Sequence, residues 1–155
     1  MKITQETIIK HSKSITVYIL SILYIIIGVK HFLNPDFFIA IMPPFIPFHK
    51  ACVFISGFFE ILFGILILFK NTRHIGAWGI ITLLIIVFPA NIYLYLSEIP
   101  REALNISKTQ ALIRMPFQIP LIIIAYWHSI EKEKILFSYI CLILFIPTIV
   151  YFINL

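Results

Sequence analysis

The sequence predicts an all-α integral membrane protein, and both its composition and its hydropathy pattern support this. Apolar residues make up 61% of the 155-residue chain and charged residues only 12%, against about 45–50% and about 25% in ordinary globular domains. Such a chain lacks the polar side chains that cover a soluble fold, which excludes a disordered protein, a coiled coil and a cytosolic enzyme. Five apolar runs each approach the roughly 20 residues that a helix needs to cross a bilayer. Helices are favoured because backbone polar groups in hydrocarbon must bond within their own segment.

Five spanning helices are expected along the chain. The runs cover residues 15–33, 51–69, 75–96, 111–128 and 135–153, and residues 1–14 precede them as an N-terminal tail. The short connections predict antiparallel neighbours. The first run is too long for the apolar core of a signal peptide, so we expect it to be a helix of the mature protein. Arg114, Pro116, Gln118 and Pro120 interrupt the fourth run, whereas the fifth run has no charged residue and is typical of a lipid-facing helix.

The loop over residues 34–50 is too apolar to be fully solvated. Asn34, Pro35 and Asp36 form an N-cap with proline at the first helical position, which predicts a short helix. The loop is rich in phenylalanine and proline, with Phe37, Phe38, Phe45 and Phe48 beside Pro35, Pro43, Pro44 and Pro47. We expect a helix lying in the membrane interface, followed by an extended proline-rich return. Two functions stay open for this loop: a membrane-surface anchor, or a lid over a cavity in the outer leaflet.

Basic residues at the ends of the runs predict the orientation. One side of the predicted bundle has Lys2, Lys10, Lys13, Lys70, Arg73, Lys132 and Lys134, and the other has Lys30, Lys50, Arg101, Lys108 and Arg114. The excess on the first side favours a cytoplasmic N-terminus and an external C-terminus. The net charge of +5 is therefore explained by the orientation of the protein in the membrane, and we do not interpret it as a sign of nucleic-acid binding. Cys52 and Cys141 form no CxxC motif and are expected to be packing residues.

Five polar side chains within the runs are predicted to reach one depth, in the outer half of the membrane. They are His31, Glu60, Asn91, Arg114 and Gln118, from four different helices. The antiparallel arrangement and the helical rise of about 1.5 Å per residue bring them to the same level. Ionisable groups at membrane depth are costly and mark candidate functional sites. Glu60 is expected to face the bundle interior, because Ser56, Gly57 and Gly64 on its side of the helix allow close approach of a neighbour.

Two interpretations of this polar group stay open. In the first, Glu60 pairs with Arg114 as a buried clamp that fixes helix register. In the second, the same residues line a ligand pocket, because His31, Asn91 and Gln118 add hydrogen-bonding capacity beyond what the pair needs. A quinone head group offers two carbonyl acceptors that these three side chains could serve, while its tail stays in lipid. Neither a metal-ligand spacing nor a phosphate-binding loop is present in the sequence, and a haem held by His74 and His128 is disfavoured.

Five separated segments carry a family resemblance. GVKHFLNPDFF, MPPFIPFHK, ISGFFEILFGILIL, RHIGAWGIITLLIIVFPANIY and RMPFQIPLIIIAYWH resemble the DoxX-like family of small membrane proteins, over about residues 18–128. The resemblance implies a transmembrane four-helix bundle over residues 15–128, with residues 135–153 as an additional C-terminal transmembrane helix. The positions that match the family's polar motifs are His31, Glu60, Asn91, Arg114 and Gln118.

The resemblance also implies a range of functions. Some DoxX-like proteins are associated with quinone-linked sulfur oxidation or respiratory oxidase complexes, and others look like assembly factors or cargo receptors. We therefore expect a redox-associated subunit of the bacterial cytoplasmic (inner) membrane that binds a quinone- or lipid-like ligand in the outer leaflet. Its expected partner is a membrane redox protein, and no nucleic-acid binding is expected. The alternative is a non-catalytic accessory or assembly factor. A proton or solute pathway would rest on Glu60 alone, without the paired broken helices of transporters.

Overall fold

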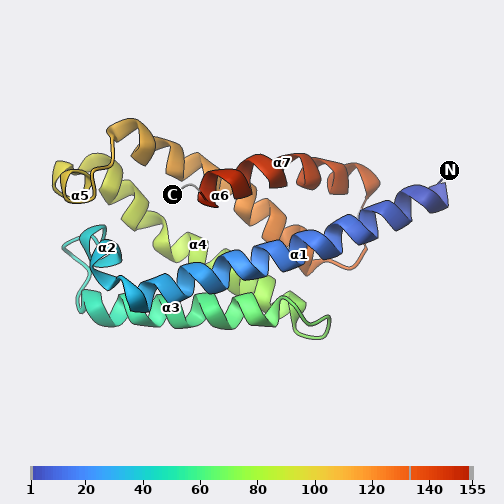
Figure 1. Ribbon diagram of the computed structural model, residues 1–155, viewed down its shortest axis with the longest axis horizontal. Coiled ribbons are helices and arrows are strands. Elements are labelled where there is room, and N and C mark those ends of the chain that lie inside the picture. The colour runs from blue at the N-terminus through green and yellow to red at the C-terminus, as the bar shows by residue number, and fades with distance from the viewer. Residues whose placement is uncertain (1, 133, 154–155) are drawn as a thin grey trace.

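The computed structural model describes residues 2–132 and 134–153, and in them it is all-α (Figure 1). The helices are α1 Lys2–Leu33, α2 Pro35–Ala40, α3 His49–Leu66, α4 Arg73–Leu96, α5 Glu98–Ala103, α6 Lys108–Ser129 and α7 Ile135–Ile153. Five of them, α1, α3, α4, α6 and α7, are long and apolar enough to cross a membrane. The predicted all-α fold with five spans is therefore confirmed.

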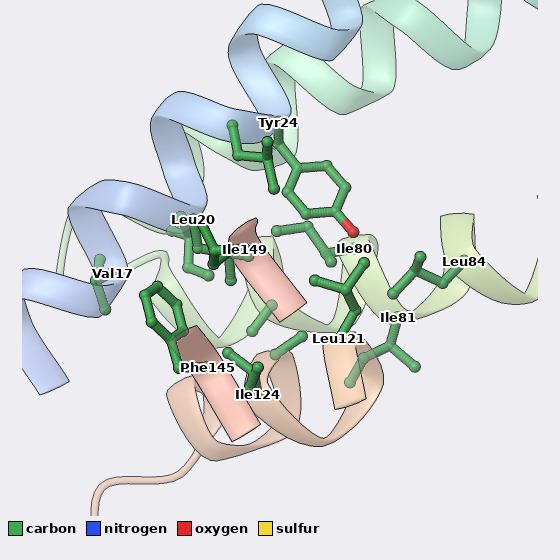
Figure 2. Close-up of a cluster of buried hydrophobic side chains, with 14 residues drawn as sticks. Val17, Leu20, Tyr24, Ile80, Ile81, Leu84, Leu121, Ile124, Phe145 and Ile149 are labelled. Carbon is green, nitrogen blue, oxygen red and sulfur yellow. The ribbon is translucent and has the colours of Figure 1, made fainter. Parts of the chain in front are cut away.

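The five long helices pack as two pairs and a closing helix. Helix α1 packs against α3 and α4 against α6, α3 also contacts α4, and α7 lies between α6 and α1. The core between them is apolar (Figure 2) and draws on four helices: Val17, Leu20 and Tyr24 of α1, Ile80, Ile81 and Leu84 of α4, Leu121 and Ile124 of α6, and Phe145 and Ile149 of α7.

The fifth span is part of this core, although its sequence is typical of a purely lipid-facing helix. Cys141 is fully buried, and Phe145 is 5% exposed, whereas Ile143 and Ile146 of the same helix are 72% and 68% exposed. The buried indole of Trp127 in α6 donates a hydrogen bond from Nε1 to Ser138 Oγ in α7 over 3.1 Å. Because both faces of α7 are apolar, hydropathy alone does not distinguish the packed face from the lipid-facing one.

Close approach of backbones holds α1 against α3. A Cβ atom placed on Gly57 would lie 2.5 Å from His31 Cβ and 2.9 Å from the Gly28 carbonyl oxygen, so neither contact leaves room for a side chain. Two turns further along, Ser21 Oγ donates a hydrogen bond of 2.6 Å to the Gly64 carbonyl. This small-residue face turns Glu60 into the bundle, where it is 8% exposed, as the sequence predicts.

The two helix pairs meet closely at one end and diverge toward the other. Near the α3–α4 connection, a Cβ on Gly76 would lie 2.5 Å from the Ile67 nitrogen, and one on Gly79 would overlap the Phe63 ring. From there α4 moves away from α3 toward the end of the molecule that carries α2 and α5 (Figure 1). The diverging helices leave space between the pairs at that end.

Two helix starts differ by three residues or more from the sequence prediction. Helix α1 begins at Lys2, so the predicted tail is helical, because no glycine or proline interrupts the segment before Gly28. Lys13 Nζ donates a hydrogen bond of 2.8 Å to the Ile130 carbonyl, which holds this extension against the α6–α7 connection. Helix α6 begins at Lys108 because Ser107 and Gln110 form a reciprocal capping box.

Helix α5 is not predicted from the sequence. Its Arg101 is 9% exposed and donates from Nη1 to the carbonyls of Leu94 and Tyr95 over 3.3 and 2.5 Å. These are among the last carbonyls of α4, which have no partner inside the helix. The short helix therefore caps α4 from outside, a contact that depends on tertiary folding.

Candidate functional site

A cavity of about 820 Å³ occupies the space where the helix pairs diverge. Side chains of α1, α2, α3, α4, α6 and α7 line it, most of them apolar. All five polar residues selected from the sequence are in its wall: His31 from α1, Glu60 from α3, Asn91 from α4, and Arg114 and Gln118 from α6. The antiparallel helices thus bring together residues that are up to 87 positions apart in the chain.

The loop over residues 34–50 closes one end of this cavity. Its lining residues are Asn34, Phe37, Phe38, Ile41, Met42 and Ile46. Phe45 and Phe48 are instead 78% and 82% exposed and are not part of the wall. The return after α2 is folded by turns and is not extended, since Ile46 N–H donates to the Pro43 carbonyl over 3.1 Å. The loop therefore forms part of the cavity wall at one end and has exposed apolar side chains, Phe45 and Phe48.

His31 connects the lid to Glu60. The His31 ring stacks on the Phe38 ring of α2 with centroids 3.5 Å apart. On its other side, His31 Nδ1 lies 2.9 Å from the Ile27 carbonyl and 3.2 Å from Glu60 Oε2. A carbonyl only accepts, so Nδ1 carries a hydrogen and donates it to Ile27. Glu60 Oε2 accordingly has no hydrogen-bond partner.

The clamp between Glu60 and Arg114 does not form. Glu60 Oε2 lies beside His31 Nδ1, and Arg114 Nη1 is buried without a hydrogen-bond partner. The reason is geometric: the glycine contact places α1 directly beside α3, whereas Arg114 extends from α6 on the far side of the cavity. The carboxyl group of Glu60 and the guanidinium of Arg114 therefore belong to residues that line one cavity without contacting each other.

Four buried polar atoms of the wall lack a hydrogen-bond partner. They are Ser56 Oγ, Glu60 Oε2, Arg114 Nη1 and Gln118 Oε1. The amide of Gln118, 5% exposed, donates from Nε2 to the Leu84 carbonyl over 3.4 Å, which leaves its oxygen free. Buried polar atoms without partners are rare, because removing them from water costs free energy that only a new hydrogen bond restores. The four side chains line the cavity, and each has one buried polar atom whose hydrogen-bonding capacity is unused.

Two wall residues with chemical roles are absent from the sequence prediction of the site. Ser56 lies one turn before Glu60 on the same helix face, so its spacing was a usable signal. Phe38 stacks on His31 only because the loop folds back over the bundle, and no spacing in the sequence shows this. Cys52 also lines the cavity, while Cys141 is buried in the core.

The remaining histidines lie outside the cavity. His74 Nδ1 is 3.1 Å from the Ser129 carbonyl, and His128 is 2% exposed with no partner for either ring nitrogen. Over the described residues, no group of three or more histidine, cysteine or acidic side chains could hold a metal ion.

Comparison with known proteins gives one match. A family model described as a domain of unknown function (DUF8561) matches residues 20–129. This span includes most of α1 and all of α2 to α6, and therefore all five polar residues of the wall. No curated protein and no solved structure matches the chain.

Proposed function

The chain belongs to the DUF8561 family, and we propose that it is a membrane protein that binds a quinone- or lipid-like ligand in the cavity between its two helix pairs. The polar head of the ligand is held by His31, Glu60, Asn91, Arg114 and Gln118. The loop over residues 34–50 covers it as a lid.

The single observation that carries this proposal is an apolar cavity lined by polar side chains that do not satisfy one another. The cavity volume of about 820 Å³ lies within the range of roughly 300–1,000 Å³ that is usual for small-molecule sites. A structural clamp would pack its polar groups against one another, whereas Glu60, Arg114 and Gln118 each leave a buried atom unused. An apolar wall with a few convergent polar groups is the usual composition of a ligand site.

The resemblance to DoxX-like proteins extends the proposal. In it, the protein is a redox-associated subunit beside a membrane redox partner, and its ligand is quinone- or lipid-like. The same resemblance suggests a bacterial cytoplasmic membrane, and the basic-residue bias supports an N-terminus inside, which puts the cavity in the outer leaflet.

Filling the cavity tests the proposed binding. Ala90 of α4 lines the void, so Ala90→Phe is expected to exclude the ligand while adding only apolar bulk. Lipids are extracted from the purified protein and quantified by mass spectrometry. For the wild type, we expect about one quinone or phospholipid molecule per protein chain. We expect about a tenfold lower ratio for Ala90→Phe. The control is Ile75→Phe on the exposed face of the same helix, where Ile75 is 57% exposed; equal ligand content in all three proteins contradicts the proposal.

The proposed orientation has its own test. Reporter fusions are expected to be active in the cytoplasm at the N-terminus and outside the membrane at the C-terminus, because five spans place the two ends on opposite sides. A cytoplasmic signal from the C-terminal fusion would show that the orientation is reversed or that α7 does not span.

A further inference from the structure

We propose that the ligand is an aminophospholipid, with its phosphodiester at Arg114 and its primary ammonium at Glu60. This inference rests on the proposed function and narrows it to one class of head group. It follows from which side chains of the cavity wall have unused hydrogen-bonding groups, and from the absence of an ion pair between Glu60 and Arg114.

The unused groups have a definite chemistry. Glu60 Oε2 and Gln118 Oε1 are acceptors, and Arg114 Nη1 is a cationic donor. The ligand must therefore present N–H or O–H donors to one wall and an acceptor with negative charge to another. Since Glu60 and Arg114 are both in the cavity wall without forming an ion pair, one molecule with two opposite charges can satisfy both.

Other lipid head groups leave part of this wall unsatisfied. An oxidised quinone has only acceptors and gives Glu60 and Gln118 no donor. A fatty acid serves Arg114 but adds a second carboxylate near Glu60. A choline head has a positive charge but no N–H group, and a glycerol head has hydroxyls but no positive charge. A primary ammonium supplies both the charge and three N–H donors, and charge-assisted hydrogen bonds of this kind are the strong ones.

The apolar wall favours a lipid over a free head group. Leu23, Ile27, Leu83, Leu84, Val87 and Leu121 line the same cavity. Ile55 and Ile86 of the wall are also 57% and 65% exposed, so the lining extends to apolar surface of α3 and α4. The acyl chain of a lipid can pack along this apolar lining, whereas soluble phosphoethanolamine has no apolar chain to bury there.

Competition among lipids tests the inference. The delipidated protein is incubated with equal amounts of phosphatidylethanolamine, phosphatidylglycerol, phosphatidylcholine and a long-chain benzoquinone, with matched acyl chains in the phospholipids. Native mass spectrometry then counts what stays bound. We expect phosphatidylethanolamine to exceed each competitor by about tenfold, the ratio that one charge-assisted hydrogen bond provides.

Glu60→Gln is expected to reduce the preference for phosphatidylethanolamine over phosphatidylcholine to about twofold. The control Glu131→Gln, which changes an exposed carboxylate, is expected to keep the tenfold preference. Arg114→Gln is expected to lower the retention of every phospholipid by about tenfold, with Lys132→Gln as its control.

The outcomes separate this inference from the function on which it rests. If no lipid of any class is retained, the proposed function fails. If lipids are retained without preference, or if the quinone exceeds phosphatidylethanolamine, only the aminophospholipid inference is overturned. Displacement of the bound lipid by soluble phosphoethanolamine at equal concentration would also overturn it. If a variant does not fold, the wild-type protein is tested with phosphatidylethanolamine in which the amine is methylated step by step. Retention of the lipid is expected to fall as N–H donors are removed, and unchanged retention overturns the inference.

Discussion

Gly57→Leu is expected to separate α1 from α3 and to destabilise the bundle severely. The added Cβ alone would lie 2.5 Å from His31 Cβ and 2.9 Å from the Gly28 carbonyl oxygen, and these are backbone-anchored atoms that cannot move aside. Overpacking typically costs about 1–3 kcal/mol, and backbone clashes place this variant at the upper end. Thermal unfolding in detergent is expected to show a decrease in melting temperature on the order of 10 °C.

The matched control for this change is Ala51→Leu. Ala51 is an exposed residue of the same helix, so the larger side chain enters lipid or detergent. Its melting temperature is expected to stay within about 2 °C of the wild type, as for most surface substitutions. Equal stability of Gly57→Leu and Ala51→Leu would mean that α1 and α3 do not meet through their glycines.

Trp127→Ala is expected to have a similarly large effect, because it removes the largest buried side chain. Trp127 is fully buried, donates to Ser138 of α7, and lies under Lys13 Nζ of α1 at 5.4 Å from the ring centroid. Its loss leaves a cavity where three helices meet and removes the hydrogen bond to Ser138, at a cost on the order of 3 kcal/mol in the free energy of unfolding. Chemical denaturation in mixed micelles measures this cost.

The second tryptophan of the chain is the natural comparison. Trp78 of α4 is 45% exposed, so Trp78→Ala is expected to cost less than about 1 kcal/mol, since little packing is lost. If both tryptophan variants unfold at the same denaturant concentration, α7 is not held against α6 through Trp127.

The grouping of the five polar residues around one cavity could be predicted from the sequence, but the contact partner of Glu60 could not. Hydropathy locates the ends of each span, and the helical rise then places Glu60 and Arg114 at one level. Which helix stands beside α3 depends on the glycine contact with α1, which no periodicity within one helix shows. For that reason His31, and not Arg114, contacts Glu60, and the predicted clamp is wrong.

Contacts made by loops and by uniformly apolar helices were the least predictable. The stacking of Phe38 on His31 and the capping of α4 by Arg101 both require a loop to fold back on the bundle. Helix α7 contributes Phe145 and Ile149 to the core, although its sequence has no polar face that would mark the packed side. These features arise from tertiary packing, whereas the five spans and the burial of Glu60 follow from local pattern.

The most direct test of the proposed binding is native mass spectrometry of the wild-type protein released gently from its micelle or nanodisc. We predict a main species that carries one lipid-like molecule per chain, held by Glu60 and Arg114 in the cavity and resistant to activation that strips surface-bound lipid. Ala90→Phe is expected to yield the bare chain under the same conditions. A wild-type spectrum with only the bare chain, or with a ladder of adducts unchanged in Ala90→Phe, would contradict the proposed binding.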